Sequence, residues 1–539
     1  MERISQYFFS NVKGDIFGGI TAGVIALPLA LAFGVASGAG AAAGLYGAII
    51  VGFFAAIFGG TKPQISGPTG PMTVVLAGII AAYPNNLDLV FVAIIMAGFF
   101  QIILGLSKAG KLIRYVPYPV ISGFMSGIGV IIILLQLNPL LGLNVSGNTI
   151  DSIINLAQNF QSTNMQSVLV GLITLAIVFF TPSKIAKNFP PALIALIGVT
   201  ILTALLKLDV ATIGNIPTSL PNFHFPIISI KDFIGIIPIA ITLSILGSVD
   251  SLLTSLVSDS LTRTNHNPNK ELIGQGIGNL FAGLFGGICG AGATMRTVVN
   301  IKSGGKTPLS GVFHSLFLLF VLLGAAHLAK YIPMPLLAGI LIKVGFDIID
   351  YKFINIINHA PKSDLAVMIF VFLLTVFDDL IFAVGAGIVL SSILFAASIA
   401  KQMNVIIDEI KETPEENGEN LSELSKYKIR MVNIDGVLFF GSASRVLMQV
   451  DDLLGTEYLI INCESIKNMD ISAMFALEDI IHRMHSKKIH VLLVLNNKEI
   501  TKKLLKVGIV KIVRINNIFY QKADAVNAIK KLIAENNNK

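Results

Sequence analysis

Charged residues are scarce over the first 401 of the 539 residues of this chain, which hold 34 of its 71 Lys, Arg, Asp and Glu side chains. The last 138 residues hold the other 37, so the charge density there is about three times as high. An ordinary soluble domain carries about 25% charged residues. Long apolar runs with so little charge are expected to face lipid, and a single soluble domain is excluded.

The apolar sequence is divided into segments of the length expected for transmembrane helices. About 20 apolar residues in a helix cross the hydrocarbon core of a bilayer. Segments 69–82 and 294–301 are too short to cross alone, and each follows a Gly-rich or Pro-rich stretch. The predicted fold class is a polytopic α-helical membrane protein with fourteen segments, at 16–36, 40–59, 69–82, 88–107, 118–136, 167–181, 190–207, 232–256, 272–287, 294–301, 309–329, 333–349, 364–377 and 379–400.

The basic residues indicate which loops face the cytoplasm. Fifteen Lys and Arg fall in one alternating set of loops, whereas the other set contains mainly Lys231 and Lys330. Loops that stay in the cytoplasm carry the excess of positive charge. We therefore expect an even number of crossings of the cell inner (plasma) membrane, with both termini cytoplasmic. The net charge of +7 then records orientation and does not indicate nucleic acid binding.

Two interruptions occupy matching positions in the two halves of the membrane part. Residues 67–75 (Gly-Pro-Thr-Gly-Pro-Met-Thr-Val-Val) mark the third segment, and residues 290–299 (Gly-Ala-Gly-Ala-Thr-Met-Arg-Thr-Val-Val) mark the tenth. Seven segments in each repeat place the two halves in opposite orientations. Broken helices at matching positions of inverted repeats, here about 10–207 and 230–401, are typical of secondary transporters with a site near the midplane. The alternative is that the glycines only allow close helix packing.

Asp250 is the most informative ionisable residue of the membrane part, because a charge inside the bilayer is costly and usually functional. It lies in the middle of segment 232–256, and Thr254 follows four residues later on the same helical face. A carboxylate and a hydroxyl that face the carbonyls of a broken helix form a hard-oxygen cation site, which suits Na⁺. The alternative is a structural Asp paired with a nearby Lys or Arg.

Arg296 and three threonines lie where the two broken helices begin. A helix N-terminus carries partial positive charge and unpaired N–H groups, so it attracts anions. Short helices that start near Thr69 and Thr294 would direct two such ends at one anion from opposite sides. The Thr73 hydroxyl and the Arg296 guanidinium would help to replace its hydration shell. The alternative for Arg296 is an ion pair with Asp250.

No pattern in the sequence indicates an enzyme. The eight His residues show no metal-ligand spacing, and the sequence contains no nucleophile elbow, zinc-protease or phosphate-loop motif. Lys343 and Asp347 are four residues apart and are interpreted as a helix-stabilising pair. We expect no cofactor, with Na⁺ acting only as a coupling ion.

After residue 401 the sequence becomes typical of a soluble domain. Residues 402–427 are rich in Glu and Asn and are expected to form a solvated linker. In 428–539, strand-like runs alternate with helical patterns, which predicts a small α/β domain. Ser472 follows a strand and opens a helix, where serine usually acts as an N-cap. The predicted strands are 430–437, 458–463 and 489–495, and the predicted helices are 444–454, 472–484, 499–507 and 523–535.

Taken together, several segments resemble the sulfate permease (SulP) family of anion transporters, the prokaryotic relatives of the animal solute carrier 26 proteins. They are 14–28, 67–73, 260–279 and 290–300. The resemblance covers essentially the whole chain and is closest to the cyanobacterial sodium-dependent bicarbonate transporters. It implies fourteen segments in two inverted repeats of seven, a core and a gate domain, and an elevator-like motion. The tail resembles a STAS domain, which implies a cytoplasmic module for regulation and homodimer formation.

The resemblance also implies roles for individual residues. The sodium site would consist of Asp250, Thr254, Gly292, Ala293 and Thr294. The anion would contact Thr69, Gly70, Thr73, Ala293, Thr294 and Arg296. The bicarbonate transporters carry a small residue where this chain has Arg296, whereas a basic residue is common in other members, including sulfate carriers. Ser472 lies at the turn where soluble STAS relatives are phosphorylated, and is the candidate regulatory residue.

The leading hypothesis is a Na⁺-coupled bicarbonate symporter. The second is a sulfate or other anion permease, proton-coupled or not, in which Arg296 offsets the additional negative charge. A passive anion channel on the same scaffold is a third, although few charged residues are present to line a pore. A membrane-anchored signalling protein that works through its tail is a fourth.

Overall fold

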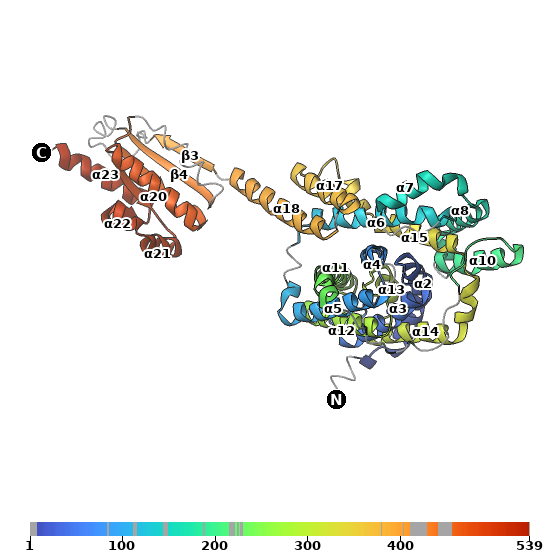
Figure 1. Ribbon diagram of the computed structural model, residues 1–539. Coiled ribbons are helices and arrows are strands. Elements are labelled where there is room, and N and C mark those ends of the chain that lie inside the picture. The colour runs from blue at the N-terminus through green and yellow to red at the C-terminus, as the bar shows by residue number, and fades with distance from the viewer. Residues whose placement is uncertain are drawn as a thin grey trace. The chain divides into compact units, whose positions relative to one another are not determined.

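The structure is a computed structural model (Figure 1). It describes residues 8–83, 86–111, 116–143, 149–186, 189–214, 221, 223, 226, 230–378, 380–402, 404–409, 428–439 and 455–537. The chain forms two compact units, Met1–Val389 and Leu390–Lys539, each with hydrophobic clusters of its own.

A helix is present at each of the fourteen predicted segments. Most ends agree to within a few residues, because Gly, Pro and polar residues bound the apolar runs. The largest difference is in α11, which continues through the polar sequence Ser-Asp-Ser to Thr262. These helices are α2 (Val12–Ala36), α3 (Ala41–Phe58), α4 (Gly70–Ala82), α5 (Leu87–Leu106), α6 (Tyr118–Leu140), α8 (Met165–Phe180), α10 (Pro191–Leu206), α11 (Ile230–Thr262), α12 (Pro268–Leu284), α13 (Thr294–Lys302), α14 (Leu309–Ala325), α15 (Met334–Ile348), α17 (Lys362–Phe377) and α18 (Leu380–Gln402).

Three further helices were not predicted: α7 (Thr149–Asn159), α9 (Ser183–Ala186) and α16 (Tyr351–Asn355). They are short, and a search for apolar runs passes over them. Among the described residues, six helices are long and apolar enough to cross a membrane, namely α2, α3, α5, α6, α11 and α18. The total of fourteen crossing segments stays a prediction.

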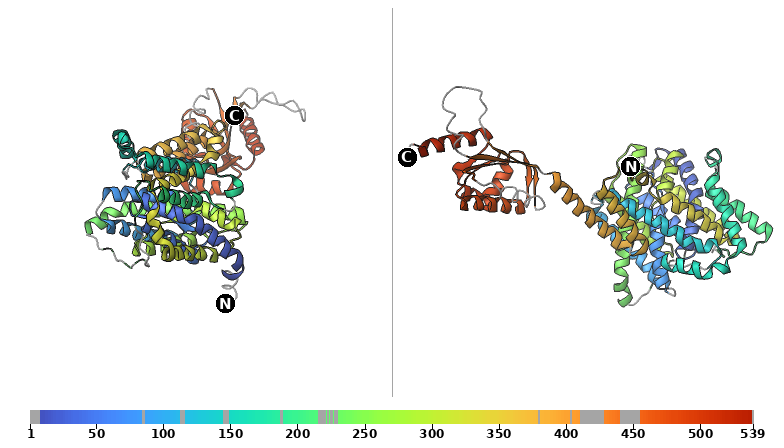
Figure 2. Two further views of the ribbon diagram at one scale, coloured as in Figure 1. Left: turned by 90° about the vertical axis from the view of Figure 1, so that its right-hand side faces the viewer. Right: turned by 90° about the horizontal axis from the view of Figure 1, so that it is seen from above.

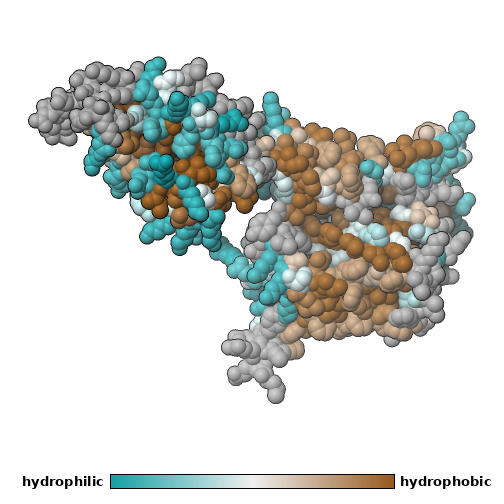
Figure 3. Space-filling view, turned by 60° about the vertical axis from the view of Figure 1, so that its left-hand side comes forward, coloured by the Kyte–Doolittle hydropathy of each residue, from teal (hydrophilic) through white to brown (hydrophobic). Residues whose placement is uncertain are grey.

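The first unit exposes large apolar side chains over a broad area. Figure 3 shows this hydrophobic surface in brown. Phe180, Leu205 and Phe320 are each at least 75% exposed, on α8, α10 and α14. A water-soluble monomer rarely exposes a continuous apolar surface of this kind, so lipid is the environment that this surface fits.

The helices of the first unit pack in two groups. In the core group, α12 packs against α3 and α5, α14 against α2 and α3, and α11 against α5 and α13. In the gate group, α15 and α17 pack against α6, and α8 packs against α10 and α15. Figures 1 and 2 show the gate group, with teal α8 and gold α17, along one side of the blue helices α2 to α5.

Glycines bring α5 and α12 into backbone contact. A Cβ on Gly98 would lie 2.5 Å from the Gly276 carbonyl oxygen, and a Cβ on Gly276 would lie 2.5 Å from the Gly98 carbonyl oxygen. Only glycine permits this approach. Close helix packing is therefore one role of the glycines in this unit.

The second unit is a mixed sheet covered on both faces. The strand order is β3-β4-β5-β7-β8; β3 is antiparallel to β4, the other pairs are parallel, and β6 also pairs with β4. Alternate residues of the strands pack against α20, α21 and α22 on one face and against α23 on the other. The elements are β3 (Asn404–Glu409), β4 (Ile429–Leu438), β5 (Tyr458–Asn462), β6 (Ile466–Met469), α20 (Ile471–Ser486), β7 (His490–Val494), α21 (Lys498–Val507), α22 (Ile509–Val513), β8 (Ile518–Phe519) and α23 (Lys522–Asn537).

The structure differs from the sequence prediction at the start of this unit. Residues 404–409, predicted as part of a solvated linker, form strand β3, because the run Val405-Ile406-Ile407 pairs with β4 despite its acidic neighbours. Residue 402 of that linker ends α18, and residues 403 and 410–427 lie outside the described residues, as does the whole of the predicted helix 444–454. The short elements β6, β8 and α22 were not predicted.

The contact between α5 and α12 gives a first prediction. Gly98→Ala should lower the free energy of unfolding of the purified protein by about 1–3 kcal/mol, because the new methyl group requires the two helices to separate. The melting temperature should fall as a result. Differential scanning fluorimetry in detergent measures the change. Gly198→Ala is the matched control, since a Cβ there meets nothing within 4 Å. Equal melting temperatures for the two variants would contradict the close packing.

Candidate functional site

The candidate site is built on a two-residue β-ribbon in the core group. In β1 (Ser66–Gly67) and β2 (Ala291–Gly292), Ser66 pairs with Gly292 and Gly67 with Ala291 in antiparallel register. The short helices α4 and α13 begin directly after these strands, at Gly70 and Thr294. The two helix N-termini, with their unpaired N–H groups, therefore start from the same ribbon.

Glycine is required in this ribbon because other chain segments approach closely. A Cβ on Gly290 would lie 2.4 Å from the carbonyl carbon of Gly67, and a Cβ on Gly67 would lie 2.7 Å from Nη1 of Arg296. Gly67 also has a φ of 154°, which L side chains rarely adopt. The Gly-rich sequences thus interrupt the helices and permit the pairing of β1 with β2.

Three of the predicted sodium-site residues are in direct contact. The Thr254 hydroxyl donates to the Gly292 carbonyl oxygen at 2.9 Å and lies 2.7 Å from the Thr294 hydroxyl. The Gly292 N–H donates to the Ser251 hydroxyl at 3.0 Å, which ties β2 to α11 one turn before Thr254.

Asp250 lies on α11 four residues before Thr254, and its side chain interacts with Thr69 and Arg296. Its Oδ2 is buried and has no hydrogen-bond partner. Leaving a buried carboxylate oxygen unpaired is costly. The Asp250 carboxylate, one helical turn before Thr254, adds to the hard-oxygen groups of this region, the Thr254 and Thr294 hydroxyls and the Gly292 carbonyl. Among the described residues no cluster of three or more His, Cys, Asp or Glu is present.

Ala293 has a structural role in the same turn. It is the residue before α13, and its N–H donates to the Ile65 carbonyl oxygen at 2.8 Å. Its carbonyl oxygen accepts from the Thr297 N–H at 2.9 Å. The Ala293 N–H is therefore already used, and the free N–H groups for an anion belong to the residues that follow.

The predicted anion side contains two further buried polar atoms without a short hydrogen bond. Arg296 is 2% exposed; its Nη2 donates to the Pro68 carbonyl oxygen, whereas its Nη1 has no hydrogen-bond partner. Thr69 is the residue after Pro68, and its buried hydroxyl makes no short hydrogen bond but interacts with the Asp250 side chain. The Thr73 hydroxyl, in contrast, donates to the Thr69 carbonyl oxygen at 2.8 Å inside α4. Arg296 thus keeps a free N–H, the Thr69 hydroxyl interacts with Asp250, and the Thr73 donor is occupied.

Arg296 and Asp250 interact electrostatically across the site. They do not form an ion pair among the described residues, since the guanidinium is held by Pro68 and Asp250 Oδ2 is unpaired. The alternative prediction of a direct Arg296–Asp250 pair is therefore not what the structure contains.

Gly70 places the site against the gate group. A Cβ on this residue would lie 2.7 Å from Ile132 Cδ1 of α6 and 3.0 Å from Ile348 Cδ1 of α15. The start of α4 therefore meets apolar side chains of two gate helices. The predicted residues gather at a boundary between the two helix groups.

Sequence reasoning missed the polar side chains beneath the ribbon. Gln64, Ser255, Glu271 and Gln275 are all at most 3% exposed and form one hydrogen-bonded network. Glu271 directly precedes the predicted segment 272–287, and Gln275 follows four residues later on the same helical face. Two polar residues on the same face of an otherwise apolar helix are a usable signal.

Comparison with known proteins agrees with this architecture. The sulfate permease family model matches residues 12–371, and the STAS domain model matches residues 424–525. This chain belongs to the sulfate permease family. The bicarbonate transporter BicA of Synechocystis sp. is 42% identical over an alignment of 539 positions that covers 98% of this chain and 96% of the relative.

Solved structures of related proteins match as well. The transmembrane domain of a cyanobacterial bicarbonate transporter BicA is 52% identical, with a TM-score of 0.65 over 70% of this chain and 98% of that chain. The murine Solute Carrier 26 family member A9 anion transporter, in the inward-facing state, has a TM-score of 0.82 over 97% and 92% of the two chains. At 18% identity it shows the shared fold alone. These relatives are transporters, in agreement with the lack of enzyme motifs.

In the STAS domain, Asp470 and not Ser472 caps α20. The Asp470 Oδ1 accepts from the Ala473 N–H at 2.8 Å. The predicted capping role of Ser472 is wrong because the preceding aspartate occupies the N-cap position. Ser472 is exposed in the first turn of the helix, with its hydroxyl accessible.

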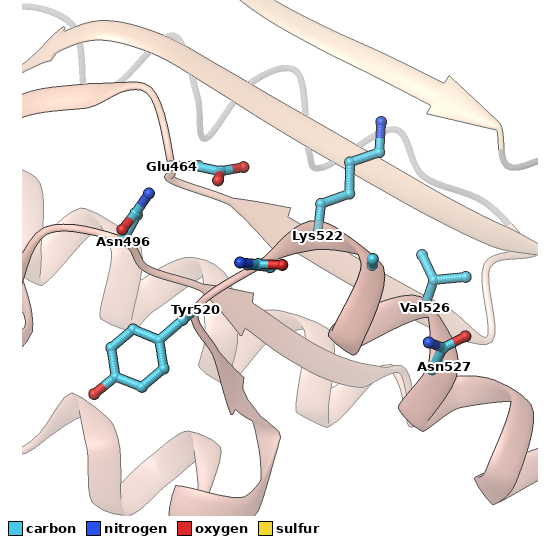
Figure 4. A pocket seen from close by; sticks show the side chains of 8 residues that line it. Glu464, Asn496, Tyr520, Lys522, Val526 and Asn527 are labelled. Atoms are coloured by element: carbon cyan, nitrogen blue, oxygen red, sulfur yellow. The ribbon is translucent and has the colours of Figure 1, made fainter.

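The STAS domain also has an open cleft at the carboxyl ends of its parallel strands (Figure 4). Glu464, Asn496, Tyr520 and Lys522 line it, and its volume is about 580 Å³. The cleft lies between the end of β7, which is followed by α21 on one face of the sheet, and the end of β8, which is followed by α23 on the other face. Open α/β sheets bind ligands at such a reversal. Its acidic, basic and amide side chains are exposed and favour no single ligand class.

The predicted pair of Lys343 and Asp347 is confirmed. The two side chains form an ion pair on α15 and are 28% and 35% exposed. This exposure is typical of a pair that stabilises a helix.

The cation site gives a second prediction. Thr254→Val keeps the shape of the side chain but removes the hydroxyl, so the affinity for Na⁺ should fall about tenfold or more, which corresponds to at least about 1.4 kcal/mol. The increase in melting temperature caused by NaCl, relative to choline chloride at equal ionic strength, should shrink accordingly. Thr174→Val is the control, because the Thr174 hydroxyl bonds only to the Val170 carbonyl within α8. Full sodium stabilisation of Thr254→Val would refute the assignment.

Proposed function

We propose that this protein is a Na⁺-coupled bicarbonate symporter of the plasma membrane. The observation that carries the proposal is the buried Asp250 Oδ2, which has no hydrogen bond and belongs to the residue one helical turn before Thr254, whose hydroxyl contacts Gly292 and Thr294 where α13 begins. The similarity to the BicA bicarbonate transporters over nearly the full length supports the choice of anion.

Coupling follows from the electrostatics of the site. Na⁺ at Asp250 neutralises the carboxylate and makes the local potential more positive, so an anion near Thr69 and the two helix N-termini binds more strongly. The anion strengthens Na⁺ binding by the same factor, because coupling between two binding sites is reciprocal. Each solute alone binds weakly, and the loaded state contains both.

The movement that we propose is an elevator-like displacement of the core group along the gate group. The ribbon, both helix N-termini and Asp250 all belong to the core group, so they would travel as one site. The chain would comprise fourteen segments in two inverted repeats of seven, with both termini in the cytoplasm. Alternate exposure of such a site to the two sides of the membrane is the usual mechanism of transporters with inverted repeats.

The STAS domain would lie in the cytoplasm, where we propose that it supports a homodimer and regulates transport. Ser472 is the candidate regulatory residue, because it is exposed at the first turn of α20 and a phosphate at a helix N-terminus is favourable.

Transport assays test the main proposal. Purified protein in liposomes should take up radiolabelled bicarbonate when an inward Na⁺ gradient is imposed and should do so much more slowly with K⁺ or choline. Protein-free liposomes are the control for diffusion of CO₂. Sodium-independent sulfate uptake without bicarbonate uptake would overturn the proposal. A conductance in planar bilayers above carrier rates would favour a channel.

Asp250→Asn is the matched variant for sodium coupling. It keeps the size of the side chain and removes the charge that Na⁺ neutralises. We expect the stimulation of uptake by Na⁺ to fall by about tenfold or more, since 1.4 kcal/mol is a factor of ten, while the melting temperature without Na⁺ stays the same or rises. An unchanged sodium requirement would show that Asp250 is not a ligand.

Arg296 favours a second candidate, transport of sulfate or another dianion. Its buried guanidinium has an unpartnered Nη1, and a fixed positive charge suits a doubly charged anion better than a singly charged one. Arg296→Gly should weaken sulfate binding by about tenfold or more and change bicarbonate uptake little, because charge-assisted hydrogen bonds contribute about 1.5–3 kcal/mol. Competition of unlabelled sulfate against labelled bicarbonate uptake measures both. Equal losses for the two anions would remove this candidate.

A further inference from the structure

A buried carboxylate lies beneath the ribbon, and it takes no direct part in the proposed binding of either solute. Glu271, in the first turn of α12, is 1% exposed. Its Oε2 accepts from the N–H groups of Gly60 and Thr61, each at 2.9 Å. Its Oε1 accepts from the side-chain amides of Gln64 and Gln275, each at 2.8 Å. Both oxygens are therefore saturated by four donors.

These bonds fix the chain that leads into β1. Asn267, at the N-cap of α12, donates its N–H to the Gly60 carbonyl oxygen at 3.2 Å. Gln275 Nε2 also lies 2.6 Å from the hydroxyl of Ser66, the first residue of β1. The segment between α3 and β1 thus contacts α12 at both ends, and Glu271 accepts from Gly60 and Thr61 at one end and from Gln275, the partner of Ser66, at the other.

Gln64 connects Glu271 to the sodium side of the site. Because its Nε2 donates to Glu271, its Oε1 is turned to accept from the Ser255 hydroxyl of α11 at 2.9 Å. Ser255 directly follows Thr254. The Gln64 amide is also in close contact with β2, since a Cβ on Gly292 would lie 2.2 Å from Gln64 Nε2.

A glutamine amide can rotate by half a turn and exchange its oxygen with its nitrogen, and neighbouring groups decide which orientation it takes. Here a carboxylate, which only accepts, faces the nitrogen, and Ser255 faces the oxygen. Loss of the Glu271 acceptor removes the reason for this orientation. The Gln64 amide, Ser255 and Gly292 would then lose their common geometry.

We propose that Glu271 is a positioning residue for the coupling ion: through Gln64 it holds the Gly292 carbonyl and the Thr254 hydroxyl in the arrangement that binds Na⁺. This inference rests on the proposed sodium coupling. It assigns to Glu271 a selective effect on the sodium half of the site, although the residue contacts neither solute. The anion half, at Thr69 and Arg296, is not bonded to Gln64.

Glu271→Gln is the test variant, because it keeps the size of the side chain and replaces one acceptor oxygen with a donor. We expect the Na⁺ concentration for half-maximal uptake to rise about tenfold or more, the range seen when groups that orient metal ligands are removed. At saturating Na⁺, the KM for the anion and the maximal rate should stay within about twofold of the wild type.

Asp15→Asn is the matched control. Asp15 is also fully buried and also accepts from backbone N–H groups, those of Lys306 at 2.7 Å and Thr307 at 3.0 Å. Asp15 lies in the first turn of α2, its partners Lys306 and Thr307 precede α14, and it has no hydrogen bond with Gln64, Gly292 or Thr254. A general loss of packing would affect both variants alike, whereas a positioning role raises the half-maximal Na⁺ concentration only in Glu271→Gln.

Gln64→Ala provides a second route that leaves Glu271 with three of its donors. It should give the same selective loss of sodium affinity, and the double variant with Glu271→Gln should be no worse than the more affected single variant, since residues in one chain of contacts are not additive. Melting temperatures with and without Na⁺ accompany the uptake assays, so folding is measured separately.

The outcomes separate the two proposals. A wild-type protein that does not respond to Na⁺ would overturn the proposed function and this inference with it. A sodium-dependent wild type with unchanged sodium affinity in Gln64→Ala or in folded Glu271→Gln would overturn this inference alone. So would equal shifts in sodium affinity and anion KM, or additive effects in the double variant.

Discussion

The pairing of β1 with β2 is the contact on which the rest of the membrane unit depends. Extended backbone inside a bilayer has to satisfy its polar groups within the protein, and side chains of three helices do so here. Asn279 of α12 accepts from the Gly290 N–H at 2.7 Å and donates to the Gly290 carbonyl at 2.9 Å. Thr297 of α13 accepts from the Ile65 N–H at 3.0 Å, and Ser251 of α11 accepts from the Gly292 N–H.

Because the backbone polar groups of the ribbon are hydrogen-bonded, the few buried side-chain atoms without a hydrogen bond are notable. Asp250 Oδ2, Thr69 Oγ1 and Arg296 Nη1 are buried without a short hydrogen bond around the same ribbon. One is an anionic acceptor, one is a hydroxyl and one is a cationic donor. Groups of this composition are the kind that would bind the two solutes of opposite charge proposed above, and no hydrogen bond of the neighbouring backbone uses these atoms.

The sequence was sufficient for the helices and for the two helix breaks, because both depend on local pattern. Apolar runs locate the helices, and the Gly-rich stretches before Thr69 and Thr294 locate the two breaks.

The sequence was not sufficient for contacts between distant segments. Glu271 belongs to the site only because residues 60 and 64 lie against α12, and no spacing within one helix encodes that contact. β3 was missed for a similar reason: its strand character comes from pairing with β4, while its acidic residues are typical of a linker. Ser472 and Asp470 compete for one capping position, and only the backbone geometry decides between them.

The contact of Gly70 with Ile132 and Ile348 has a mechanical consequence. Where the core group meets the gate group at this point, the touching atoms are a glycine and two isoleucine methyl groups. Dispersion contacts have no preferred direction, and each is individually weak. In the proposed elevator-like displacement, the two surfaces would exchange one apolar neighbour for the next at this point, without breaking a hydrogen bond at each step. This contact between side chains differs from the close backbone contact between Gly98 and Gly276, which holds the core helices α5 and α12 together.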